Sequence, residues 1–111
     1  MLKIKRVYEE PSESDGIRIL VDRLWPRGLT KQKASIDFWM KDSAPSNILR
    51  KWFNHNPKKW GGFRSRYLAE LRASGQLVVL KKRAKGKVTL VYATKDERHN
   101  NAVALKSFLE K

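Results

Sequence analysis

The sequence contains no cysteine, which excludes disulfides, thiolate nucleophiles and sulfur-ligated metal centres. No apolar run approaches the roughly 18 residues of a membrane span, and residues 1–6 lack the apolar core of a signal peptide. The histidines His55 and His99 lie among Asn and Lys residues, so we predict neither a metal site nor a cofactor. These absences predict a cytoplasmic protein with no membrane partner.

Acidic residues are scarce in the middle of the chain. The formal net charge is +14, and residues 43–95 contain 13 Lys or Arg but a single acid, Glu70. Such a section attracts anions, including nucleic acid phosphates, nucleotides and anionic surfaces. The alternative interpretation is a solvated basic surface that aids solubility.

The length of the chain and its hydrophobic and aromatic content indicate a packed fold. The chain has 111 residues, 41% of them hydrophobic, with four Trp, three Tyr and four Phe. This length suits one domain, and the aromatic content is typical of a buried core. We therefore predict one α/β domain over residues 1–111.

The hydrophobic pattern alternates between strands and helices. Residues 2–7 alternate apolar and basic side chains, which predicts an edge strand, while 17–24 and 88–93 are apolar runs typical of interior parallel strands. Helices are predicted over 47–54, 57–73 and 100–110, the first after a Ser46 cap and the second after Asn56-Pro57. The class of segments 36–40 and 76–85 stays open between strand and helix. The pattern predicts a small, single-domain, Rossmann-like layered α/β fold with a mostly parallel central sheet.

A polar cluster follows each of the two interior strands. Ligands of parallel sheets bind at the carboxyl ends of the strands, so these clusters indicate a site. In the first, Arg23 and Arg27 flank Pro26 and suit a rigid anion clamp, with Asp22 as orienting group or general base. The alternative is an internal ion pair between Asp22 and Arg23, with Trp25 and Pro26 packed on the core.

The second cluster begins at Lys95 and Asp96 and reaches the start of the last helix. Backbone N–H groups at a helix start favour an anion, and the Asn100 and Asn101 side chains suit sugar or base edges. The alternative assigns Asp96 or Asn100 to helix capping. Arg64, on the apolar face of the 57–73 helix, either extends along that face to solvent or reaches into the site.

Several of these motifs together resemble one bacterial family. They are Val21-Asp22-Arg23-Leu24-Trp25-Pro26-Arg27-Gly28, Ala44-Pro45-Ser46 with Leu49-Arg50-Lys51-Trp52-Phe53, Phe63-Arg64-Ser65-Arg66-Tyr67 with Glu70-Leu71, and the strand 88–93 followed by Asn100-Asn101-Ala102. The chain is similar to the domain of unknown function 488 family, also called YeaO-like. The resemblance implies a compact α/β domain and brings neither an activity nor catalytic residues.

Two functions remain open, and the sequence does not decide whether either is enzymatic. The first is binding or acting on a phosphorylated or nucleotide-like anionic ligand at the strand carboxyl ends. The second is nucleic acid binding by the basic 43–95 section, with Trp39, Trp52 or Trp60 as stacking residues. For the first, the predicted catalytic residues are Asp22 and Asp96, and the predicted ligand-binding residues are Arg23, Arg27, Arg64, Lys95, Asn100 and Asn101. The predicted partner is an anionic small molecule or a nucleic acid, and the oligomeric state is open.

Overall fold

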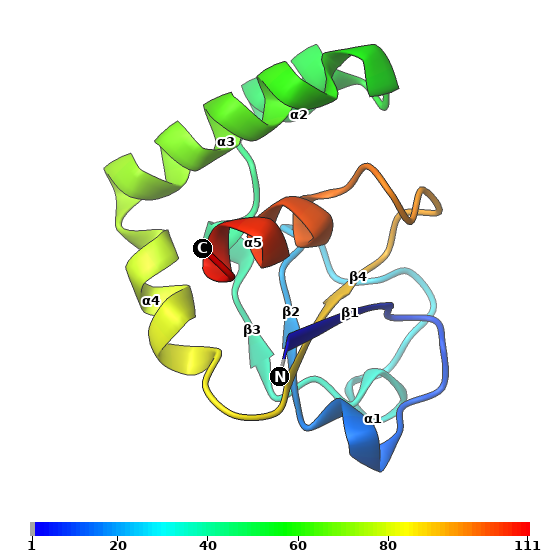
Figure 1. Ribbon diagram of the computed structural model, residues 1–111. Coiled ribbons are helices and arrows are strands. Elements are labelled where there is room, and N and C mark those ends of the chain that lie inside the picture. The colour runs from blue at the N-terminus through cyan, green and yellow to red at the C-terminus, as the bar shows by residue number, and fades with distance from the viewer. Residues whose placement is uncertain (1) are drawn as a thin grey trace.

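The computed structural model describes residues 2–111, which form one four-stranded parallel sheet with helices around it (Figure 1). In order across the sheet, the strands are β1 (Leu2–Arg6), β4 (Val88–Tyr92), β2 (Ile17–Leu20) and β3 (Phe38–Trp39). Ile19 of β2 pairs with Leu90 of β4, so the two strands are parallel neighbours. The α/β class, the parallel sheet and the edge position of the first strand are confirmed.

The helices begin close to the residues that the capping signals indicate. Among residues 2–111 they are α1 (Lys31–Ala34), α2 (Asn47–Phe53), α3 (Trp60–Ser74), α4 (Gln76–Arg83) and α5 (Asn101–Leu109). The Ser46 hydroxyl accepts the backbone N–H of Leu49 at 3.1 Å and caps α2. Asn56 caps a short 3-10 turn (Pro57–Lys59) that leads directly into α3. Side-chain oxygens at these positions satisfy N–H groups that have no partner within the helix.

The two faces of the sheet carry cores of different size. Ile19, Val21 and Leu90 face a large core that also holds side chains of α2, α3, α4 and α5. Leu20 and Val91 face a smaller cluster, which is covered by α1 and by partly buried residues of the segment from 25 to 36. In Figure 1, α5 crosses the front of the sheet while α2 and α3 lie beyond one end of it.

Of the two segments that the sequence leaves open, one contains a strand and the other forms a helix. Residues 38–39 form the short edge strand β3, which pairs in parallel with β2. Residues 76–83 form α4, in spite of the β-branched Val78 and Val79. Both valines are exposed, and Leu80 is the buried apolar residue of this helix. Gly75, with φ of 76°, ends α3 and starts α4, a backbone conformation that glycine adopts readily.

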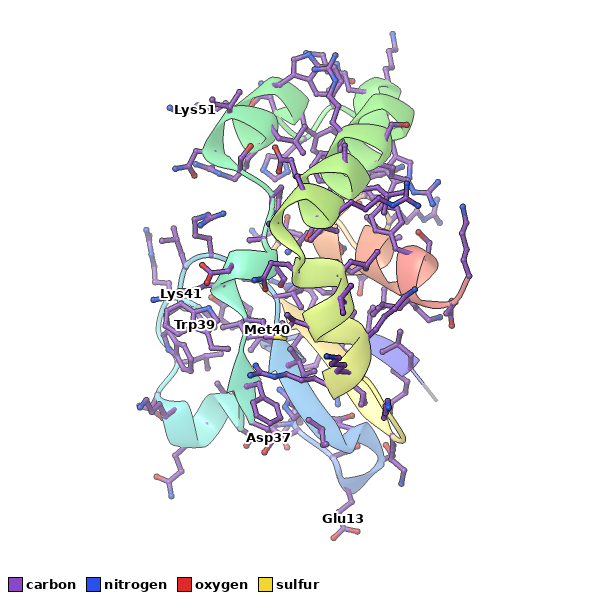
Figure 2. The ribbon with its side chains drawn as sticks, turned by 90° about the vertical axis from the view of Figure 1, so that its left-hand side faces the viewer. Glu13, Asp37, Trp39, Met40, Lys41 and Lys51 are labelled. Atoms are coloured by element: carbon purple, nitrogen blue, oxygen red, sulfur yellow. The ribbon has the colours of Figure 1, made fainter. Side chains whose placement is uncertain are left out.

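The strands point their carboxyl ends toward α2. Figure 2 shows β3 rising from Asp37 to Met40, with Lys51 of α2 at the far end of the molecule. The residues directly after β2 and β4, including Asp22 and Ala93, therefore lie at the end of the sheet that faces α2 and α3. Among residues 2–111, no helix combines the length and the apolar character needed to cross a membrane.

Candidate functional site

A cavity of about 540 Å³ lies at the carboxyl ends of β2 and β4. Its walls are mostly apolar, with contributions from the segment after β2, from α2 and α3, and from the start of α5. The lining residues are Asp22, Arg23, Leu24, Trp25, Pro26, Ala44, Pro45, Asn47, Arg50, Phe53, His55, Phe63, Ala93, Thr94, His99, Asn100 and Asn101. Asp22 is the one acid among them, so the charged side chains of the wall are net positive.

The Asp22 carboxylate joins the ends of both strands to α5. Its Oδ2 accepts the backbone N–H of Ala93 at 2.9 Å, and its Oδ1 accepts the Asn101 side-chain amide at 3.0 Å. The same amide donates to the Val21 carbonyl at 2.9 Å. Burial raises the pKa of Asp22, and the hydrogen bonds from Asn101 and Ala93 oppose this rise. Asp22 therefore holds the strand ends and α5 together at the cavity, and it is a lining acid whose pKa is raised.

Arg23 points its guanidinium along the wall of the cavity. Its Nη2 donates to the carbonyls of Ala44 at 3.4 Å and Pro45 at 3.3 Å, both weak contacts for a group with five N–H donors. The internal ion pair with Asp22, one alternative from the sequence, does not occur among residues 2–111. Trp25 and Pro26 do pack inward, as that alternative predicts: Trp25 lies on the smaller core and Pro26 is buried.

The two asparagines at the start of α5 have structural partners. Asn100 caps the helix, since its Oδ1 accepts the N–H of Val103 at 2.9 Å while its Nδ2 donates to the Asp96 carbonyl at 2.8 Å. Asn101 holds Asp22, as described above. Both line the cavity as well, so their structural contacts leave them next to the space that a ligand would occupy.

Asp96 does not line the cavity, but it holds His99, which does. Its Oδ1 accepts the backbone N–H groups of Arg98 and His99 at 2.9 and 3.0 Å, and its Oδ2 lies 3.2 Å from Nδ1 of His99. The hydrogen bond from the Arg98 amide is the main cause that lowers the pKa of Asp96, so the carboxylate stays charged. His99 lines the cavity, with its ring edge-on to Trp60 at 5.4 Å.

Three of the predicted ligand-binding cations lie away from the cavity. Arg27 and Lys95 are exposed, and the Arg27 carbonyl accepts the Tyr8 hydroxyl at 2.9 Å. Arg64 donates from Nη2 to the Ser107 hydroxyl at 2.8 Å and lies over the Phe108 ring, at the far end of α5. Of the predicted charged site residues, Asp22 and Arg23 line the cavity, whereas Arg27, Arg64, Lys95 and Asp96 do not.

A family model described as the inactive DUF488-N3 subclade matches residues 1–111. The chain belongs to this family. The Escherichia coli K12 protein named "Uncharacterized protein YeaO" is 42% identical over 112 residues, covering 97% of this chain and 96% of the relative. A Mycobacterium tuberculosis H37Rv protein, "Uncharacterized protein Rv3073c", is 40% identical over 109 residues, covering 97% and 92%. No solved structure gives a significant match. The family resemblance drawn from the motifs is confirmed.

The cavity of this DUF488 chain also holds residues that the sequence interpretation missed. Arg50, His55 and His99 line it, and none of them follows a buried strand directly. Arg50 lies four residues after the Ser46 cap, about one turn along α2. The signal for His99 was the spacing of three residues from Asp96, which suits a carboxylate–imidazole contact. Among residues 2–111, no group of three or more His, Cys, Asp or Glu side chains is placed to hold a metal ion.

Proposed function

We propose that the protein binds a small phosphorylated, nucleotide-like anion in the cavity at the carboxyl ends of β2 and β4. One observation carries this proposal: the cavity joins apolar walls to the arginines Arg23 and Arg50, while its acid, Asp22, is already hydrogen-bonded. A planar guanidinium binds a phosphate through paired hydrogen bonds, and apolar walls suit the body of a heterocyclic ligand.

The dimensions and charge of the cavity support the same ligand class. Its volume of about 540 Å³ falls inside the ~300–1,000 Å³ range of small-molecule sites. Phe53 and Phe63 contribute aromatic surface on the side of α2 and α3. The net charge of +14 attracts an anion from a distance, and Arg23 and Arg50 select it at short range.

We favour a protein that binds the ligand without catalysing a reaction on it. Both carboxylate oxygens of Asp22 accept hydrogen bonds from the protein, and Asp96 lies off the cavity wall. The two hydrogen bonds from the protein occupy part of the acceptor capacity of Asp22 and hold its carboxylate in place, which favours a structural role over that of a general base. The description of the matching family model as inactive points the same way.

Isothermal titration calorimetry with the four ribonucleoside 5′-monophosphates tests the proposal. We expect saturable one-to-one binding of at least one nucleotide, about tenfold or more tighter than inorganic phosphate, because the apolar walls add contacts to the phosphate interaction. The corresponding nucleosides control for the phosphate contribution. Equal affinities for every nucleotide and for inorganic phosphate would refute recognition by the cavity.

A second candidate function is polyanion binding by the last turn of α4 and the segment after it. Lys81, Lys82 and Lys85 are exposed and form no ion pair among residues 2–111, which leaves their charges available. Of the three tryptophans predicted to stack on bases, Trp39 is exposed, whereas the rings of Trp52 and Trp60 are covered by other side chains. Trp52 has Arg66 at 3.9 Å and Lys59 at 5.0 Å over its ring, and Trp60 packs against Phe53 and Phe63.

Combined substitution of Lys81, Lys82, Arg83 and Lys85 by alanine tests this candidate. If the segment binds polyanions, the variant should weaken binding of a single-stranded oligonucleotide in fluorescence anisotropy and flatten its salt dependence, because fewer phosphates are neutralised. The fold should survive, since these side chains are exposed. Unchanged affinity and salt slope would leave solubility as the role of these charges.

A further inference from the structure

The ring of His99 is held on two sides at the wall of the cavity. Its Nδ1 lies 3.2 Å from Oδ2 of Asp96, and its ring packs edge-on with the Trp60 ring, with 5.4 Å between the ring centroids. Trp60 is fixed in turn by stacking on Phe63, a core residue. These two contacts restrict the orientation of the imidazole in the free protein, which is the preorganisation that favours ligand binding.

The contact with Asp96 also selects the tautomer of the ring. The carboxylate accepts hydrogen bonds and donates none, so Nδ1 of His99 must carry the proton. In a neutral imidazole the other nitrogen is then an acceptor. Among residues 2–111, Nε2 of His99 makes no hydrogen bond, so this acceptor has no protein partner there.

The contact between Asp96 Oδ2 and the His99 ring is not needed to shape the loop before α5 or to begin that helix. The loop is closed by Oδ1 of Asp96, which accepts the amides of Arg98 and His99. Helix α5 is capped by Asn100, not by His99. The bond from Oδ2 to the ring is thus additional to the contacts that shape the segment, and its effect is to orient His99.

We propose that His99 is a ligand-contacting residue of the cavity, whose Nε2 accepts a hydrogen bond from an N–H or O–H group of the ligand, with Asp96 as its positioning residue. The inference rests on the proposed function for the presence of a ligand. It narrows the ligand class: Arg23 and Arg50 bind the phosphate, and the base or sugar presents a donor to His99. Phosphorylated compounds without such a donor bind less tightly.

The tautomer is tested in the free protein by long-range ¹H–¹⁵N correlation spectra of the histidine rings at mildly alkaline pH. We expect Nδ1 of wild-type His99 to be protonated. In Asp96→Asn the side-chain oxygen can still accept the loop amides, while the amide nitrogen facing Nδ1 donates, so the proton should move to Nε2. A wild-type ring protonated at Nε2 overturns the positioning role of Asp96, whatever the ligand.

The ligand role is tested with adenosine 5′-monophosphate as the probe in calorimetry. In His99→Ala, loss of a neutral hydrogen bond should weaken binding about 3- to 10-fold. In Asp96→Asn, the protonated Nε2 of His99 would face the hydrogen-bond donor of the ligand, which should weaken binding about tenfold. His99→Gln keeps a polar group near the Nε2 position and should recover part of the loss. Glu97→Gln, an exposed neighbour off the cavity wall, is the matched control, and thermal melting checks that each variant folds.

The outcomes separate the two proposals. Unchanged affinity in His99→Ala and Asp96→Asn, with normal binding by the wild type, overturns the role of His99 and leaves the cavity proposal intact. Absence of binding by the wild type to every nucleotide tested overturns the cavity proposal and the ligand role of His99 together.

Discussion

Replacement of Asp15 by alanine is expected to lower the free energy of unfolding by about 3–5 kcal/mol, the cost of removing one partner of a buried ion pair. The Asp15 side chain is fully buried, and its Oδ2 accepts Nη1 of the buried Arg18 at 2.7 Å. Lys5 and Lys3 lie 3.2 and 3.4 Å from the same carboxylate. The variant leaves the Arg18 guanidinium buried beside β2 without its countercharge.

Urea unfolding of Asp15→Ala, with Glu13→Ala as the control, measures this effect. Glu13 lies in the same 3-10 turn but is exposed, so its loss should change stability by less than about 0.5 kcal/mol. Equal stabilities of the two variants would show that the ion cluster does not support the start of β2.

Lowering the pH should also remove the stabilisation that the charged Asp15 carboxylate gives to the fold. Burial by itself raises the pKa of Asp15, but the Ser12 amide and the Lys5 and Arg18 side chains outweigh it and hold the pKa well below its usual range. The folded state thus keeps the carboxylate charged where the unfolded chain, with an Asp pKa of about 3.9, binds a proton. The stability from Asp15 is present above about pH 4 and is lost as the pH falls toward the lower folded value. The raised pKa of Asp22 opposes this slope, so the comparison is between wild type and Asp15→Asn, in which the fall should be smaller.

The double variant Arg23→Ala, Arg50→Ala is expected to weaken nucleotide binding about 100-fold or more. Each arginine contributes charge-assisted hydrogen bonds worth about 1.5–3 kcal/mol, and every 1.4 kcal/mol is a factor of ten in affinity. The melting temperature should change little, because both side chains are exposed and Arg23 makes only two long hydrogen bonds.

The double variant Arg27→Ala, Lys95→Ala is the matched control for calorimetry. It removes the same number of positive charges, but from exposed side chains that do not line the cavity. We expect its affinity to fall far less, by long-range attraction alone. Equal losses in the two variants would mean that net charge, and not the cavity, determines binding.

The main features of the fold were predictable because they depend on local pattern. The runs that became β2 and β4 are mostly apolar, which is typical of interior parallel strands. The caps Ser46 and Asn100 determine where α2 and α5 begin. The pattern did not settle α4, because Val78 and Val79 favour a strand locally, while the packing of Leu80 on the core favours a helix.

Long-range contacts explain what the sequence did not reveal. Asp15 meets Lys5 across 10 residues, and its carbonyl accepts the Thr89 hydroxyl across 74, so no local pattern identifies this cluster. At the cavity, strand-end position identified Asp22 and Arg23, since the side chains next to a strand end lie near it. The same rule did not place Arg27 or Lys95 at the wall, because side-chain direction beyond the strand end depends on the turn that follows.

The most direct test of the proposed cavity is a titration of ¹⁵N-labelled protein with adenosine 5′-monophosphate, followed by ¹H–¹⁵N correlation spectra. If the nucleotide binds there, the largest saturable shifts should fall on the amides of residues 22–25 and 93–101, which surround the carboxyl ends of β2 and β4. Shifts that concentrate on residues 81–87, or that spread evenly over the basic surface without saturating, would contradict a cavity site.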